Sequence, residues 1–440
     1  MIPIFLLGAA IAAADPIPGP TPAPTPVPTA PAPTAPAPTT GGLLTLDQAV
    51  RMALANHPDA AAAAARVTAA ETRVEQTYAP TRPQLDGTAT AGVSGTEPPD
   101  FLGPNPTAQV KLTLGFLITD FGQSHARTRS AQLGVESAKT GIVATEFALV
   151  ADVENAYFEV VARDALVEVV DAAVAAEERH LGEAQRLVKV GVAPSFDEAQ
   201  AKTRLAVAKS QLARAKGDAR LARAKLAQAI GGGDTMATTV TAAWPGPESG
   251  EDGQLDALVA EAIDRRPDAL AADLALRSAD AAIDSAQQGL NPTLSVGAQL
   301  GAPAEESGVG AGWGATVTLK WPFLDGGLTD AQVEEARAER SVSEAEKASL
   351  RLRIHTEVET AQVAIQSAKA QLEASAASRD IAKESLRLAE ARYAQGLSSG
   401  IELADAQASV VATGADTVSA EWTLAAARAS LRAALGRGPR

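Results

Sequence analysis

The most constraining feature of this 440-residue chain is a stretch without proline that runs from Thr329 to Gln395. Its residues are mainly Ala, Glu, Arg, Lys, Gln, Leu and Ser, which are all good or acceptable in helices. One α-helix of this length would extend about 100 Å, because each helical residue adds about 1.5 Å. A globular domain seldom needs such a rod, so the stretch predicts an elongated, mainly helical protein.

Apolar residues along this stretch are spaced alternately by four and three positions, as in the seam of a coiled coil. The seam consists of Ile354, Val358, Ala361, Ile365, Ala368 and Leu372. A seam of this kind needs partner helices. After a break at Gly396–Gly400, the same rhythm continues from Leu403 to Leu431, which predicts a second helix that packs back along the first.

The same pattern occurs twice in the chain. One constant shift aligns Asp120 with Asp325 and Val153 with Val358, and upstream of the strands the shift is slightly longer. Internal repetition at a fixed offset indicates one repeated architecture. The predicted layout is a first repeat at 43–233 (β-hairpin about 84–120, tip about 190–196), a linker at 234–253, a second repeat at 254–436 (β-hairpin about 293–325, tip about 395–401), and a tail at 437–440.

The N-terminal residues have a different character. Residues 1–14 are apolar and end in small residues, as in a secretory signal peptide, although a basic start is missing. Residues 15–42 alternate proline with alanine and threonine, which predicts a disordered tether. Elsewhere no apolar run is long enough to cross a bilayer as a helix, so no transmembrane helix is expected.

The two non-helical segments predict β-hairpins with one apolar and one polar face. In the second hairpin the apolar positions lie between Trp313 and Trp321, which an extended strand would separate by about 26 Å. This distance matches the apolar band of an outer-membrane barrel between its aromatic girdles. Phe116 ends the apolar series of the first hairpin. Four strands cannot close a barrel, and open strand edges are not tolerated in lipid, so three copies with twelve strands are expected.

Composition excludes several classes of function. The chain has no cysteine, which excludes disulfides, a thiol nucleophile and a cysteine zinc site. The net charge of −15 argues against a nucleic-acid partner. The four histidines are scattered without a metal-binding or catalytic spacing. We therefore expect no cofactor, no metal and no enzymatic activity.

Three motifs resemble the outer-membrane efflux protein family, the TolC-like trimeric channels of tripartite pumps. They are Arg265–Asp268 followed by an Ala-rich helix into Leu290–Pro292, the corner Trp321–Gly327, and the segment Arg392–Gln407. The resemblance covers roughly residues 43–436. It implies a mainly α fold with a small β part: a trimer with a twelve-stranded outer-membrane barrel and a twelve-helix periplasmic tunnel. It also implies a passive exit duct for efflux or type I secretion, with a periplasmic adaptor and an inner-membrane pump as partners.

The resemblance also assigns residues to a gate at the tips. Acidic side chains at the positions of Glu402 and Asp405 form a ring in similar channels, and an aspartate and a tyrosine at the positions of Asp197 and Tyr393 form a latch. A basic member of that latch aligns here with Ser398. From the residues alone, the same acids read as helix N-terminal residues favoured by the helix dipole, and Ser195–Glu198 and Ser399–Glu402 read as capping boxes.

The tip glycines, Gly191 and Gly396, are first of all turn formers. With Ser399, they are also the expected contacts for the adaptor, because they lie at the exposed end of each hairpin. One alternative remains open at this point: a periplasmic coiled-coil adaptor or scaffold without a pore. That alternative explains the long helices but not two hairpins with tryptophans at girdle spacing.

Overall fold

The computed structural model describes residues 43–94, 105–191, 194–232, 239–305, 308–395 and 397–438. The expected signal peptide and the Pro-rich tether lie outside the described residues, as does Gly396. The first repeat contains helices α1 (Leu46–Asn56), α2 (Pro58–Tyr78), α3 (Gln123–Lys189) and α4 (Ser195–Ala229), a 3₁₀ turn η1 (Ala79–Thr81), and strands β1 (Gln84–Ser94) and β2 (Asn105–Thr119).

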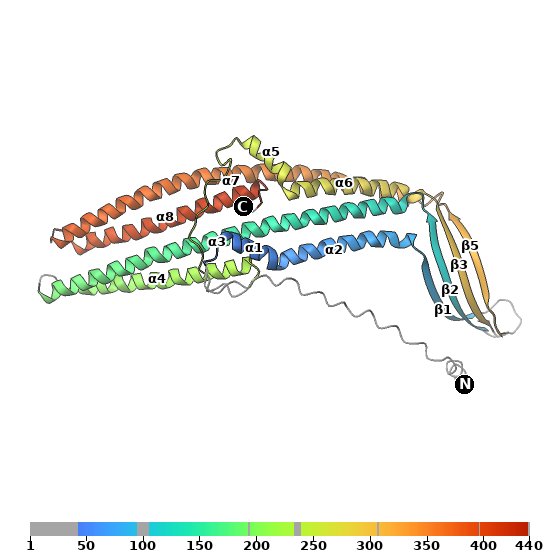
Figure 1. Cartoon of the computed structure of the whole chain (residues 1–440), viewed down its shortest axis with the longest axis horizontal. Coiled ribbons are helices and arrows are strands. Elements are labelled where there is room, and N and C mark those ends of the chain that lie inside the picture. The colour runs from blue at the N-terminus through green and yellow to red at the C-terminus, as the bar shows by residue number, and fades with distance from the viewer. Residues whose placement is uncertain are drawn as a thin grey trace, which may run out of the picture. The chain divides into compact units, whose positions relative to one another are not determined.

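The second repeat has the same order of elements (Figure 1). It contains helices α5 (Leu255–Arg265), α6 (Pro267–Gln287), α7 (Leu328–Ala394) and α8 (Gly400–Ala434), a 3₁₀ turn η3 (Gln288–Leu290), and strands β3 (Thr293–Glu305), β4 (Gly308–Val309) and β5 (Gly312–Lys320). Both long helices have 67 residues and both return helices have 35. The predicted repeat is confirmed, since α7 follows α3 at the same shift that takes Asp120 to Asp325, and α5 follows α1 at the longer upstream shift.

The two hairpins join into one antiparallel sheet in the order β1-β2-β3-β5, and the short β4 extends the last hairpin. The junction between the repeats is the β2–β3 pair, in which Leu112 lies opposite Leu300. Within residues 43–438 this sheet lies at one end of the helical part, and the α3–α4 and α7–α8 tips lie at the other (Figure 1).

Each sheet-to-helix corner is capped by an aspartate. Asp120 accepts hydrogen bonds from the backbone N–H groups of Gly122 (3.3 Å) and Ser124 (2.7 Å). Asp325 accepts them in the same way from Gly327 (3.0 Å) and Thr329 (2.8 Å). These bonds satisfy N–H groups that a helix start leaves without partners. The repeated corner explains why both long helices begin at equivalent positions.

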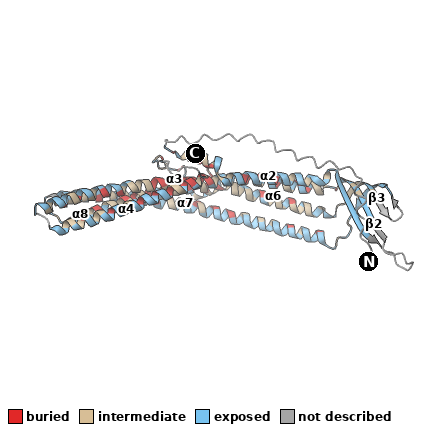
Figure 2. Cartoon of the chain, turned by 90° about the horizontal axis from the view of Figure 1, so that it is seen from below, coloured by how far each residue is buried: buried red, intermediate tan, exposed pale blue. Residues whose placement is uncertain are grey.

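The seams pack as the spacing predicts. Ile354, Val358 and Ile365 of α7 are fully buried against α8, with Leu372 partly buried at the end of the series. Val153 and Val160 of α3 are equally buried in the first repeat. Buried residues gather along the middle of α3, whereas the described residues of the strands are exposed or only partly buried (Figure 2).

A glycine ends each return helix where it meets the corner between two short helices. Gly231 (φ +95°) lies so close to the α1–α2 corner that a Cβ atom would be 2.9 Å from the His57 Cα. Gly436 (φ +63°) has the equivalent place, with 3.0 Å to the Arg266 Cα. Only glycine adopts such a conformation without strain and also leaves room for the neighbouring backbone.

Residues 239–253 are bound to the core, although the sequence suggested only a linker. Val240 forms a parallel β-bridge with Leu44, and the Tyr157 hydroxyl donates to the carbonyls of Leu44 (3.0 Å) and Thr241 (2.9 Å). Trp244 stacks on Phe158 with ring centroids 6.3 Å apart. Residues 239–253 therefore act as a strap around the middle of the bundle.

Candidate functional sites at the helix tips and the bundle midpoint

The two tips are tight turns between α3 and α4 and between α7 and α8. Gly191 adopts a φ of +75°, and its N–H donates to the Val188 carbonyl (3.0 Å), as expected for a turn former. In the second tip the Leu397 N–H donates to the Arg392 carbonyl (2.9 Å). The role of Gly191 as an adaptor contact stays a prediction.

The start of α8 is capped, but not by the reciprocal box that its sequence predicts. The Ser399 hydroxyl accepts from the Glu402 N–H (3.3 Å), as expected. The Glu402 carboxylate, however, accepts from the Ser398 hydroxyl (2.5 Å) and lies 4.0 Å from the Arg392 guanidinium. The carboxylate points toward Ser398 and Arg392, not back to the backbone of Ser399, because these two residues offer a hydroxyl and a cation.

The capping box predicted at Ser195 is wrong. Pro194 is the N-cap of α4, and Ser195 is already the first helical residue, so its hydroxyl does not cap the helix. Glu198 instead forms an ion pair with Lys202 (2.8 Å), one turn further along, and approaches Gln185 of α3 (3.5 Å). The fixed φ of proline suits an extended cap position, which displaces the helix start by one residue.

Glu402 and Asp405 are both exposed and lie three residues apart on one face of α8. Residues at this spacing are neighbours on a helix surface. A ring of carboxylates from several copies of the chain would require such a pair on one exposed face of each copy. The ring itself stays a prediction.

The structure brings Tyr393 and Asp197 into one cluster, but through a third residue. The Tyr393 ring lies edge-on to His180 of α3, with centroids 5.6 Å apart. Burial raises the pKa of the Tyr393 hydroxyl, and the nearby carboxylates of Asp197 and Glu183 add to this effect. Among the described residues no hydrogen bond joins Asp197 to Tyr393, so their role as a latch stays a prediction.

A second contact between the tips comes from α4. The Arg204 guanidinium donates to the Gly400 carbonyl at the start of α8 (3.1 Å). Near it lies Glu177 of α3, whose pKa is raised by burial and lowered in part by Arg204. The Glu177 Oε2 atom is buried and has no hydrogen-bond partner among the described residues. Arg204 therefore connects the first hairpin to the backbone of the second.

Sequence reasoning missed His180 and Arg204 at the tips. A signal for His180 existed, because Glu177 and His180 continue the spacing of Val170 and Val174 along the buried face of α3. Polar residues in an apolar seam are informative, since their burial requires partners. Nothing comparable marks Arg204, which lies on a helix with many exposed cations.

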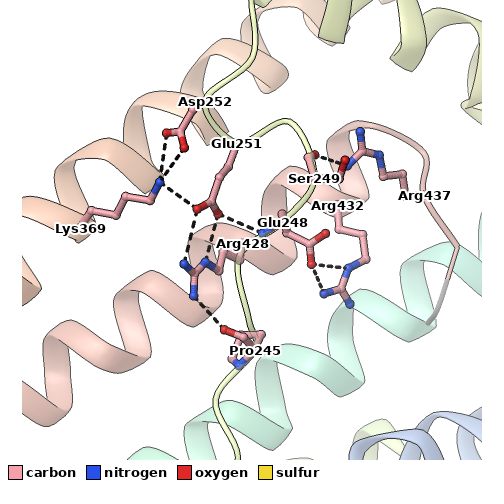
Figure 3. Close-up of polar contacts among 9 residues, drawn as sticks. All are labelled: Pro245, Glu248, Ser249, Glu251, Asp252, Lys369, Arg428, Arg432 and Arg437. Carbon is pink, nitrogen blue, oxygen red and sulfur yellow. Dashed lines mark hydrogen bonds and ion pairs between the residues drawn. The ribbon is translucent and has the colours of Figure 1, made fainter.

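A buried charged cluster at the midpoint joins the two repeats, and Figure 3 shows its Arg432–Glu248 pair. Arg432 near the end of α8 forms ion pairs with Glu154 of α3 and Glu248 of the strap, and the Arg432 Nε–Glu248 Oε1 distance is 3.1 Å. All three side chains are at most 6% exposed. Removal of one partner from a buried ion pair typically costs about 3–5 kcal/mol. This cluster therefore holds the first repeat, the strap and the second repeat together.

The strap has a second attachment one turn away. Glu251 is bound by Lys369 of α7 (2.8 Å) and by Arg428 of α8 (3.2 Å), and Arg428 also donates to the Pro245 carbonyl (2.8 Å). Burial raises the pKa of the Glu251 carboxyl, but the hydrogen bonds from Lys369 and Arg428 outweigh this effect and lower it below its usual value. The carboxylate form of Glu251 thus fixes the strap to both helices of the second hairpin.

Most large apolar side chains of the sheet share one face. The register places Leu112, Leu300 and Trp313 in one row across three strands, and Phe116 in a row with Val296 and Val317. Trp313 is 84% exposed, and Trp321 lies one residue beyond β5, with its ring 4.8 Å from that of Phe323. The register thus agrees with the predicted apolar face, and the place of the three aromatics in a membrane girdle stays a prediction.

Comparison with known proteins identifies the class to which this fold belongs. The family model for the outer membrane efflux protein matches residues 49–232 and 258–437, which together include both repeats. The chain belongs to the outer membrane efflux protein family. Its helical part, with the small sheet at one end, is the fold of outer-membrane efflux channels, and the chain is an outer-membrane protein with a periplasmic extension.

Particular relatives support this assignment. Protein CyaE of Bordetella pertussis is 30% identical over 341 residues, which are 76% of this chain and 71% of CyaE. The toluene efflux pump outer membrane protein TtgC of Pseudomonas putida is 25% identical over 76% of this chain and 70% of its own length. The crystal structure of VceC from Vibrio cholerae is similar with a TM-score of 0.73 at 22% identity, and covers 89% of this chain and 96% of VceC.

The family assignment also decides between the two open readings. A periplasmic scaffold without a pore is not favoured, because the matched family consists of outer-membrane efflux proteins and the match extends through the strands. The comparisons point to transport proteins rather than enzymes. In the described part of the chain, no helix has the length and apolarity needed to cross a membrane.

Proposed function

We propose that three copies of this chain form a channel that is the passive exit duct of a tripartite efflux or secretion system. The observation that carries the proposal is the sheet. Among the described strands, β1 pairs only with β2 and β5 pairs only with β3, so both edges are open. Open edges are not stable in lipid, whereas pairing of β1 in one copy with β5 in the next would close a barrel of twelve long strands.

An apolar stripe on α7 supports the same assembly. Beyond the first turn, the large exposed apolar side chains of α7 are Val342, Leu352, Val363, Ile381 and Leu388. At about 100° per residue they fall within about 80° of arc, which is one face of the helix. This face needs a partner helix, and a second copy of the chain supplies one at the same level when its strands pair with the first.

The proposed partners are an inner-membrane pump and a periplasmic adaptor that contacts the tips. A duct of this kind has no energy source of its own, so an inner-membrane pump must supply the energy, and a periplasmic adaptor must connect the two. We propose that the adaptor contacts the exposed tips at Gly191, Gly396 and Ser399. Toluene efflux is stated for one relative, and small apolar compounds are accordingly one candidate substrate class.

The proposed gate is the ring of Glu402 and Asp405 from three copies, with Asp197 and Tyr393 beside it. Six carboxylates around a narrow entrance attract cations and repel anions. The test is electrical: the chain is purified in detergent, its oligomer mass is measured, and single channels are recorded in a planar bilayer. We expect a trimer with cation-preferring channels, and the E402A/D405A double variant should lose much of that preference.

Two results would contradict this proposal. A chain that stays monodisperse without detergent and never inserts in a bilayer would exclude the channel. Unchanged ion selectivity in the double variant, with intact trimers, would exclude the acidic ring but not the channel.

A further inference from the structure

The two hairpins touch at their tips through His180. Its ring on α3 meets the Tyr393 ring of α7 in an edge-on contact with centroids 5.6 Å apart, and the side chain is buried. The second contact is the Arg204–Gly400 hydrogen bond (3.1 Å). Separation of the tips would break both contacts and expose the His180 ring to water.

The surroundings of His180 contain both signs of charge. Titratable groups reach it from its own helix, from α4 and from α7, and α8 contributes the backbone carbonyl that Arg204 binds. These groups are Glu183 of α3, Asp197 and Arg204 of α4, and Tyr393 of α7, and Glu177 of α3 interacts with Arg204. The buried ring thus faces one cation and several acids across the contact.

We propose that His180 is a proton-responsive latch between the two hairpins: its neutral ring holds the tips together, and its protonation favours their separation. The proposal deepens the gate described above and rests on that proposed function.

The physical reason is the cost of a second buried cation. A charged imidazolium would lose its hydration in this contact and would lie near the Arg204 guanidinium, which remains charged at all relevant pH values. Burial lowers the pKa of His180, Arg204 lowers it further, and Glu183 and Asp197 only partly oppose this. After separation of the tips, water would solvate the imidazolium.

The direction of the pH effect follows from this difference. The separated state binds the proton more readily than the closed state, so acidification favours separation. The closed contact keeps its full stability above the ordinary histidine pKa of about 6.5, and loses stability as the pH falls below that value. The midpoint cluster around Arg432 contains no histidine, so the change should be confined to the tips.

The test is a distance measurement between the two hairpins. Because the chain has no cysteine, the substitutions Ser210→Cys on α4 and Ser409→Cys on α8 give two unique and exposed spin-label sites. Labelled chains are diluted with an excess of unlabelled chains, so that one oligomer carries one labelled copy. Distances are then recorded between about pH 7.5 and about pH 5.5, which brackets the histidine pKa.

We expect the mean distance to lengthen on acidification in the wild-type background. His180→Gln, a neutral residue at the same place, should abolish the change, and His125→Gln on a distant part of the same helix should leave it intact. Arg204→Gln removes the cation that disfavours a protonated ring, so it should weaken the pH-dependent change, which provides a second variant should His180→Gln fail to fold.

A pH-dependent change that persists in His180→Gln, or a distance that does not respond to pH in the parent, would overturn the latch. The measurement does not depend on conduction. A chain that shows the expected distance change but forms no channel in a bilayer would contradict the proposed function and leave the latch intact.

Discussion

Replacement of Arg432 by methionine tests whether the buried cluster fixes the strap. The substitution keeps much of the length of the side chain but removes the guanidinium that binds Glu154 and Glu248 in a buried site. Loss of one partner from such a pair costs about 3–5 kcal/mol. If local opening of the strap depends on this cluster, the free energy of opening falls by that amount. Each decrease of about 1.4 kcal/mol raises the equilibrium constant for opening about tenfold.

Hydrogen exchange measures this opening directly. Amides of residues 239–253 should exchange about 10²- to 4 × 10³-fold faster in Arg432→Met than in the wild type, because exchange follows the open population. Arg387→Met is the matched control, since Arg387 pairs with Glu384 (2.6 Å) on an exposed helix face, where ion pairs contribute little. In the Glu154→Gln background the effect of Arg432→Met should be smaller, because one carboxylate is then neutral.

Equal exchange of the strap in Arg432→Met and Arg387→Met would refute the reasoning. It would mean that the β-bridge at Val240 and the packing of Trp244, rather than the ion pairs, hold the strap in place.

Two further predictions concern the midpoint. Gly231→Ala should destabilise the protein clearly more than Gly232→Ala in thermal unfolding. Both residues have φ in the left-handed region, but only at Gly231 would the new Cβ meet backbone, 2.9 Å from the His57 Cα. Equal losses of stability would mean that the close approach is relieved without cost. Attachment of the strap at Glu251 should be fully stable above the ordinary glutamate pKa of about 4.3, and should weaken as the pH falls below it, because the folded-state pKa of Glu251 is depressed. Hydrogen exchange of residues 239–253 between about pH 6 and about pH 3, corrected for intrinsic rates, measures this loss, and Glu251→Gln should remove the pH dependence.

The sequence predicted the architecture well because periodicity carries most of it. The three-four spacing from Ile354 to Leu372 places the same side chains in the seam that the structure buries, and the constant shift between the repeats gives both long helices the same length. The alternation of apolar and polar residues around Trp313 is equally informative, since a shift of the strand register by one residue would move its apolar side chains to the other face of the sheet.

The contacts at the tips and midpoint were less predictable because they join residues far apart in the chain. Arg432 and Glu154 are separated by 278 positions, and no local pattern links them. The strap was expected to be a linker because its prolines and glycines exclude regular structure, but they do not exclude anchoring through Glu248 and Glu251. The Ser195 capping box failed because one preceding proline displaced the helix start.

The length of the return helices has a mechanical consequence. Each has 35 residues and ends at a glycine packed against a corner, so about 52 Å of stiff helix separates that pivot from the tip. A rotation of only about 5° at the pivot would displace the tip by about 4–5 Å, on the order of one helical turn. A small repacking near Gly436 would thereby be amplified into a displacement of the tips at the far end of the bundle.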